Sequence, residues 1–237
     1  LMRAAVAEAV HHARHREVFG RKLFDQPLMV RVLADMALDV AGATALAFRL
    51  ARAFDQAADD ETQAAWLRLM TPGVKYWICK IAPGLTYEAM ECLGGDGYCE
   101  SFPMARFYRE APVNAIWEGS GNVMALDLLR VMERTPQVLE TVMGDLEEGL
   151  GSTGSSTMDV LRTAAGIAAS DQGSARFLIE QLALTAAGAE LKRLGGGRIA
   201  DAFIASRLGG AWRSTYGMMD ARYDPKAILD TLYPGGE

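Results

Sequence analysis

The chain has 237 residues, half of them hydrophobic, and a formal net charge of −6 at pH 7. Such a chain can bury a sizeable core, as one large domain or as two small ones. The negative balance argues against nucleic acid as the default partner of the whole chain, and three cysteines are too few for a disulfide framework or a zinc site.

The beginning of the chain has no features of an export signal. No apolar run reaches about 18 residues without a charge, so no membrane-spanning helix is expected. Leu1 enters a helical pattern in mid-stride, which indicates a cut within a longer protein. We therefore expect a cytoplasmic protein with buried, reduced cysteines and no membrane partner, and we interpret the chain as the carboxyl-terminal part of something larger.

Helical periodicity dominates the first 134 residues, and strand signals are nearly absent. Apolar residues at alternating steps of three and four predict two long helices with one buried stripe each. The stripes are Leu33, Met36, Val40, Ala43, Ala47, Leu50 and Phe54 in the first helix, and Met70, Val74, Trp77, Ile81, Leu85 and Ala89 in the second. We expect Pro72 and Pro83 to kink or split the second helix.

Together with two shorter segments, these helices predict an all-α fold built on an antiparallel four-helix bundle. The four segments are residues 1–18, ended by Gly20, then 27–54, 63–93 and 119–134.

The remaining residues predict an additional helical subdomain. Thr135-Pro136 is a typical start for a helix, here reaching about Leu150. A polar, flexible linker or loop is expected over residues 151–157. Helical pattern then returns over 158–169, 175–194 and 199 to about 215, and Asp224-Pro225 opens a last short helix. We place a boundary near residue 135, with a bundle over 1–134 and an extension over 135–237.

One segment of the extension is basic. Residues 192–222 hold six arginines and lysines against two aspartates, a local charge of +4 in an acidic chain. The segment is either a solvated helical face or a patch for phosphate, including the backbone of double-stranded DNA. The candidate DNA-binding residues are Lys192, Arg193, Arg198, Arg207 and Arg213.

Two further motifs point to phosphate. Gly94-Gly95-x-Gly97 follows a helix rather than a strand, and no Lys-Ser or Lys-Thr follows it, so it is neither a dinucleotide fingerprint nor a P-loop. It is either a helix cap and turn or a loop that lets backbone approach a phosphate closely. Arg16 lies just before a tight glycine turn, a position that suits bidentate binding of phosphate.

Glu118 stands alone between an aromatic residue, Trp117, and a glycine at the start of a helix. Either the aromatic neighbour desolvates the carboxylate and tunes it as a base, or the glutamate merely stabilises the helix dipole. His11 and His15 are spaced for chelation, but no third ligand completes the set, so no metal site is expected.

In order and spacing, residues 1–134 resemble the C-terminal helical domain of the acyl-CoA dehydrogenase family. The motifs that carry the resemblance are Arg16-x-x-Phe19-Gly20-x-x-Leu23, Leu33-Ala-Asp-Met36, Gly94-Gly95-x-Gly97-Tyr98 and Trp117-Glu118-Gly119-Ser120. Residues 109–114, Ala202-Phe203 and residues 206–210 are similar to the AidB-like branch, flavoproteins of the DNA-alkylation response.

The resemblance implies an oxidoreductase that removes the α-proton of an acyl-CoA thioester while hydride passes to FAD. It implies that Glu118 is the base, that backbone at Glu118 and Gly119 binds the thioester, and that Trp117, Ser120 and Asn122 lie at the flavin. It further implies a homodimer or homotetramer, in which Arg16, Phe19, Gly94 and Gly95 meet the pyrophosphate of the partner's FAD. Glu91 stands where many members have glutamine and would face ribose hydroxyls.

Three functions compete at this point. The first is the dehydrogenase, of which this chain alone would hold half a site and neither turn over nor retain FAD well. The second is a protective DNA-binding flavoprotein with vestigial dehydrogenase activity. The third is a purely structural helical oligomerisation domain.

Overall fold

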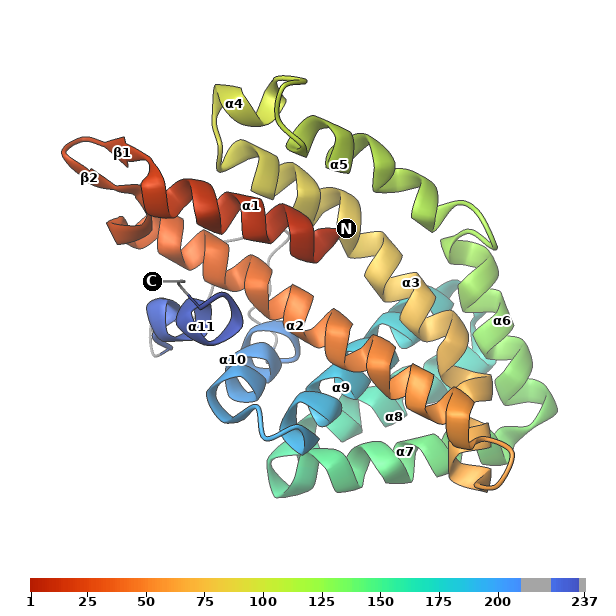
Figure 1. Cartoon of the computed structure of the whole chain (residues 1–237). Coiled ribbons are helices and arrows are strands. Elements are labelled where there is room, and N and C mark those ends of the chain that lie inside the picture. The colour runs from red at the N-terminus through yellow and green to blue at the C-terminus, as the bar shows by residue number, and fades with distance from the viewer. Residues whose placement is uncertain (210–222, 235–237) are drawn as a thin grey trace.

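In the computed structural model, residues 1–209 and 223–234 are described, and within them nearly all regular structure is helical. The strands there are two residues long, Glu17–Val18 (β1) and Arg21–Lys22 (β2), and they pair antiparallel around a two-residue turn. The predicted all-α fold is therefore confirmed. Figure 1 shows the long helices α2 and α3 running side by side through the molecule.

The bundle is formed by helices α1 (Met2–His15), α2 (Pro27–Gln56), α3 (Glu61–Glu91) and α6 (Gly121–Arg134). Helices α1, α2 and α6 all pack against α3. Pro27 opens α2 at its first turn, where a missing N–H costs nothing. The Asp60 carboxylate caps α3 by accepting hydrogen bonds from the backbone N–H groups of Thr62 and Gln63.

The expected interruption of the second long helix does not occur as a split. Pro72 and Pro83 both lie inside α3, which continues without a break from Glu61 to Glu91. A proline removes one helical hydrogen bond, but α3 is packed along its length by α1, α2, α6, α7 and α9. Tertiary packing therefore overrides the local helix-breaking preference.

Short elements link the bundle helices. The 3-10 helix η1 (Leu23–Asp25) leads from the hairpin into α2. Between α3 and α6 lie α4 (Gly95–Tyr98), α5 (Met104–Glu110) and the 3-10 helix η2 (Pro112–Ala115). These elements carry the chain across one side of α3, so that residues 94–97 and 117–122 flank the same helix (Figure 1).

The extension contains α7 (Pro136–Leu150), α8 (Ser155–Ser170), α9 (Ala175–Arg193), α10 (Gly197–Arg207) and α11 (Pro225–Leu232). Short 3-10 turns, η3 (Gly151–Gly154) and η4 (Gln172–Ser174), join α7 to α8 and α8 to α9. Asp224 caps α11 as its sequence position predicts. For the helix predicted over residues 199 to about 215, the part beyond residue 209 lies outside the described residues.

The flexible linker predicted at residues 151–157 is wrong. Gly151 has a φ of +62° and turns the chain directly into η3, and α8 begins at Ser155. A Cβ on Gly154 would lie 2.3 Å from the Leu150 Cβ, so this glycine permits a tight turn rather than a loose connection. Met158 and Leu161, just beyond, are fully buried.

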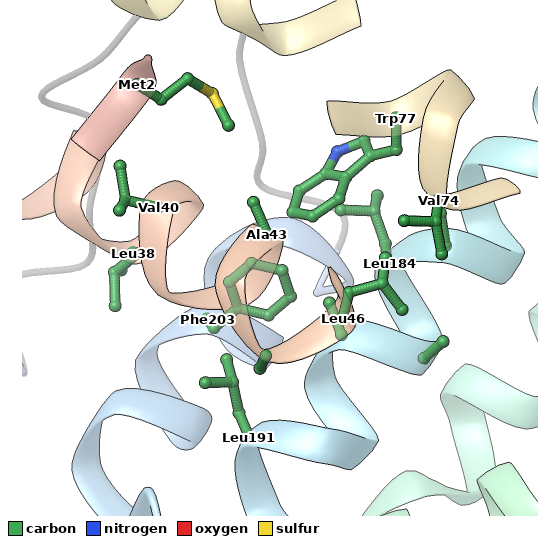
Figure 2. Packing of buried hydrophobic residues seen from close by; sticks show 14 of the residues in the cluster. Met2, Leu38, Val40, Ala43, Leu46, Val74, Trp77, Leu184, Leu191 and Phe203 are labelled. Atoms are coloured by element: carbon green, nitrogen blue, oxygen red, sulfur yellow. The ribbon is translucent and has the colours of Figure 1, made fainter. Parts of the chain in front are cut away.

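One continuous hydrophobic core joins the bundle and the extension, because α9, α10 and α11 all pack on α2. Figure 2 shows Phe203 of α10 against α2. A Cβ on Gly42 would approach the Phe203 ring to 2.5 Å, and the Trp77 ring meets Phe203 edge-on at 6.0 Å between centroids. The missing side chain at Gly42 is what admits this ring.

The stripe predicted for α2 is right only over its first half. Leu33, Met36, Val40 and Ala43 are buried, but Ala47 and Phe54 are exposed. The buried face moves instead to Leu46, Arg49 and Ala53, where α2 meets α9 and the start of α3. A single stripe fails here because α2 has partners on more than one side. Over the described residues, no helix combines the length and the apolar character needed to cross a membrane.

Candidate functional site

The loop that leads into α6 has a strained backbone at Glu118. Glu118 has a φ of +54° and Gly119 follows with +109°. Among the described residues, Phe19 is the only other non-glycine residue with positive φ, and Gly20 follows it in the same way. Such a conformation costs about 1–3 kcal/mol and concentrates at functional sites. Both residues are members of the site predicted from sequence.

Lys75 of α3 forms hydrogen bonds with the backbone of this loop. Its Nζ donates hydrogen bonds to the carbonyl oxygen of Gly119 at 2.6 Å and to that of Asn114 at 3.4 Å. Gly121, at the start of α6, also lies close to α3: a Cβ there would be 2.6 Å from the end of the Lys80 side chain and 3.3 Å from the Tyr76 ring. Sequence reasoning missed Lys75. The available signal was a lysine inserted between Val74 and Tyr76, which are both buried.

The predicted desolvation of Glu118 is not found within this chain. Glu118 is exposed, and the Trp117 side chain is 59% exposed rather than packed over the carboxylate. Ser120 stands at the N-cap of α6 without a side-chain capping bond, and it is exposed together with Asn122. The described residues therefore leave more than half of the Trp117 surface exposed.

A second group of predicted residues gathers at the end of α3. Arg16, Glu91, Gly94 and Gly95 line one pocket of about 360 Å³ between the hairpin and α4, together with His12 and Asp96 among others. Two complete long helices, α2 and α3, separate Arg16 from Gly94 in the sequence. The fold brings the two residues to one pocket.

The glycine loop divides into open and packed positions. Gly94 has a φ of +61°, and a Cβ at Gly94 or Gly95 would meet nothing within 4 Å. By contrast, a Cβ on Gly97 would lie 2.0 Å from the Met90 carbonyl oxygen. The pair therefore leaves its backbone accessible to a ligand, whereas Gly97 is required by packing.

Phe19 lies outside this pocket. It occupies the tip of the β1–β2 hairpin with 98% of its surface exposed. Positive φ at both Phe19 and Gly20 is the geometry of a two-residue hairpin turn, which usually favours Asn or Gly at its first position. A bulky apolar residue held there is suited to contact something outside this chain.

The charges of the pocket are mixed. Arg16 is exposed, and no described residue forms an ion pair or a side-chain hydrogen bond with it. Two carboxylates, Glu91 and Asp96, line the same pocket. Burial lowers the pKa of His12; the charge of Asp96 opposes this, and Arg16 and His11 add to the lowering. An accessible glycine backbone and Arg16 fit a diphosphate, and Glu91 fits only a hydroxyl-bearing neighbour.

The two groups of residues are distinct patches. From Lys75, beneath the Glu118 loop, to Glu91, at the pocket, α3 advances about 24 Å at 1.5 Å per residue. Figure 1 shows the same separation: the hairpin and α4 lie at one end of α3, and the start of α6 lies along its side.

In the described part of the basic segment, residues 192–209, three of the four basic side chains bond to other parts of the fold. Arg207 is buried, with Nη1 at 2.6 Å from Asp35 Oδ1 and Nε at 2.9 Å from Asp39 Oδ1. Arg193 bonds to Asp145, and Lys192 donates to the Leu150 carbonyl oxygen. Arg198 is exposed, and Arg213 lies outside the described residues. The prediction of Arg207 as a DNA contact is wrong, because the fold uses it to join α10 to α2.

Comparison with known proteins agrees with the fold and the order of these motifs. The chain belongs to the acyl-CoA dehydrogenase family: residues 1–133 match the family model described as acyl-CoA dehydrogenase, C-terminal domain. It is 54% identical over 140 residues to the putative acyl-CoA dehydrogenase AidB of Escherichia coli, a match that covers 59% of this chain and 26% of that protein.

Solved structures extend the likeness beyond the matched domain. The crystal structure of Caenorhabditis elegans ACDH-11 in complex with C11-CoA is similar with a TM-score of 0.73 and 25% identity, over 98% of this chain and 44% of that one. The Bacillus anthracis acyl-CoA dehydrogenase complexed with FAD shares the fold, with a TM-score of 0.63 and 16% identity over 98% of this chain and 44% of that one. The chain thus spans about a quarter of the curated relative.

Proposed function

We propose that this chain forms the C-terminal helical part of an FAD-dependent acyl-CoA dehydrogenase, with Glu118 as the base that removes the α-proton of the thioester. The observation that carries the proposal is the strained Glu118–Gly119 backbone, held on Lys75 and flanked by exposed Trp117 and Ser120. A strained conformation that the fold anchors, rather than relaxes, is expected where a side chain must be presented in one direction.

The chemistry requires a dry site. The α-proton of a thioester is very weakly acidic, so its removal needs a positioned carboxylate in surroundings of low water content. Glu118 is exposed here, and exposed apolar residues lie close to it in the sequence: Ile116 is 67%, Trp117 59% and Val123 50% exposed. An exposed apolar rim of this kind is suited to be covered by other protein. We propose that this rim is covered by the domains of the full-length family members that lie outside the present chain.

FAD would accept the β-hydride when bound. In this proposal Arg16 and the backbone of Gly94 and Gly95 hold its diphosphate, with Glu91 directed to a ribose hydroxyl. Trp117, Ser120 and Asn122 would border the flavin ring, and Gly119 the thioester. Because the two patches lie apart along α3, we expect each of them to contact a different FAD molecule. This arrangement supports a homodimer or homotetramer in which Arg16, Phe19, Gly94 and Gly95 reach the FAD of the partner.

The alternative DNA-binding function is not favoured by a specific observation. Arg207 is enclosed between Asp35 and Asp39, and Arg193 is bonded to Asp145. Both guanidinium groups are engaged in contacts between helices, which leaves Arg198 as the exposed arginine without an ion pair among the described candidates.

The proposal is tested by Glu118→Gln in the full-length protein. Because the amide keeps the shape but cannot take a proton, turnover of acyl-CoA should fall at least about 100-fold, the usual scale of general-base catalysis, while flavin content stays unchanged. The matched control is Glu110→Gln on α5, an exposed glutamate nearby, which should keep full activity. Wild-type turnover in the Glu118→Gln variant would show that the base lies elsewhere.

A further inference from the structure

We propose that Lys75 is a positioning residue of this site: it holds the Glu118–Gly119 backbone in its strained form and thereby aims the carboxylate and the neighbouring amide. The inference rests on the proposed role of Glu118 as base. It goes further by assigning a role to a lysine on a different helix, 43 residues earlier in the chain.

The bonding of Lys75 is unusual for a lysine. Its side chain is half-buried on α3, and no carboxylate among the described residues lies within ion-pair distance of it. Its ammonium instead donates to two main-chain carbonyls, that of Asn114 at the end of η2 and that of Gly119 at the start of α6. A half-buried cation without a described counter-ion is costly unless its donors are used, and here they clamp both ends of the loop that carries Glu118.

The clamp fixes more than one atom. A planar trans peptide holds its C=O and N–H antiparallel. With the Gly119 carbonyl drawn toward Lys75 and α3, the N–H of Ser120 in the same peptide unit points away from α3. Positive φ at Glu118 and Gly119 is maintained because relaxing either residue would pull the Gly119 oxygen from the ammonium.

The surrounding contacts leave the loop little other support. The Ser120 side chain makes no capping bond, and the atom nearest to a Cβ on Gly119 would be the end of the flexible Met124 side chain. Burial raises the pKa of the Cys79 thiol, one turn further along α3, whereas the charge of Lys75 lowers it. Lys75 is therefore the principal polar link between α3 and the loop among the described residues.

The first experiment measures amide hydrogen exchange and needs no activity. In the 237-residue chain, Lys75→Met keeps the apolar stem and removes the donors. The amide N–H groups of Trp117 and Met124 donate to the carbonyl oxygens of Val113 and Ser120. In the variant, both amides should exchange at least about tenfold faster. Lys75→Arg should restore much of the protection. Lys80→Met on the same helix is the control, because Lys80 packs near Gly121 without a hydrogen bond to the loop.

The second experiment uses the full-length protein with its flavin. Lys75→Met should lower kcat about 10- to 100-fold with little change in KM, the pattern of a misplaced rather than a missing group, and Lys75→Arg should recover part of it. Unchanged exchange at Trp117 and Met124 would overturn the inference. The inference is also overturned if Lys75→Met exchanges faster at these amides but keeps the wild-type kcat, while Glu118→Gln abolishes turnover. If Glu118→Gln is also fully active, the proposed function itself fails.

Discussion

Phe19 and Glu118 share a local arrangement that explains why two distant residues are strained. Each has positive φ, and each is followed by a glycine that also has positive φ. The glycine completes a tight turn that the preceding bulky residue enters at a cost. At Phe19 the result is an aromatic ring at a hairpin tip, and at Glu118 it is a carboxylate at a helix entrance. In both cases the turn directs a side chain outward.

The three cysteines differ in burial, so the reactivity of each thiol tests the described packing around it. Burial, reinforced by the charges of Glu88 and Glu91, raises the pKa of the Cys92 thiol to about 12, whereas Cys99 is exposed. Because the thiolate is the reactive form, alkylation of the native chain near pH 8 should label Cys99 first and Cys79 more slowly. Cys92 should be labelled only after unfolding, as mass spectrometry of the peptides would show. Rapid native labelling of Cys92 would contradict the described packing.

At the scale of elements, α10 is held on α2 by a group of buried ion pairs within an apolar contact, which we call the polar lock. Arg207 bonds to Asp35 and Asp39, and Phe203, one turn earlier, fills the space over Gly42. The two contacts fix both the position and the rotation of α10.

Removing the guanidinium should be costly. Arg207→Met takes away the cation between two buried carboxylates, and breaking such a pair from one side typically costs about 3–5 kcal/mol. The free energy of unfolding from denaturant titration should fall by this order. Arg198→Met on the exposed side of the same helix should change it by about 0.5 kcal/mol or less. Equal stabilities for the two variants would show that the lock contributes nothing.

The same lock shows where prediction from sequence ends. Periodicity and caps predict the helices closely, because they depend on residues a few positions apart: Asp224-Pro225 begins α11 as expected. Asp39 and Arg207 are 168 residues apart, and nothing local distinguishes a buried arginine from one facing solvent. Only resemblance to a family grouped Arg16 with Gly94 in advance, and the structure shows the two residues lining one pocket. The role of Lys75 was not predicted from the sequence, because its hydrogen-bond partners are backbone carbonyl oxygens, which every residue has.

For the whole molecule, a second buried network ties the extension to the bundle. Arg49 of α2 is 1% exposed, lies 4.0 Å from the Trp66 ring centroid and pairs with Asp145 of α7 and Glu190 of α9. Asp145 also accepts hydrogen bonds from the Trp66 indole and from Arg193. Four helices therefore meet at one carboxylate.

This carboxylate should make the stability sensitive to acid. Burial alone would raise the pKa of Asp145, but the bonds and charge of Arg193, with Trp66 and Arg49, outweigh burial and hold the pKa below its ordinary value of 3.8. A carboxyl with a lowered folded pKa stabilises the fold above its unfolded pKa, and this contribution is lost as the pH falls through the folded value. The denaturant concentration at the midpoint of unfolding should therefore decrease as the pH falls below about 4.

Asp145→Asn provides the comparison. At neutral pH it should be less stable than wild type by about 1.5–3 kcal/mol, the scale of hydrogen bonds to a charged group. The difference should shrink as the pH falls below 4, since the wild-type carboxyl is then protonated too. A difference that stays constant between neutral pH and pH 2 would contradict the assignment of this network.

The role of Glu118 is tested most directly by deuterium exchange at the α-carbon of a bound acyl-CoA. The full-length flavoprotein is incubated with the thioester in D2O, and label in recovered substrate is measured by mass spectrometry. The account predicts α-deuteration by the wild type and by Glu110→Gln, at least about 100-fold slower exchange in Glu118→Gln, and an intermediate rate in Lys75→Met. Undiminished exchange in Glu118→Gln would contradict it.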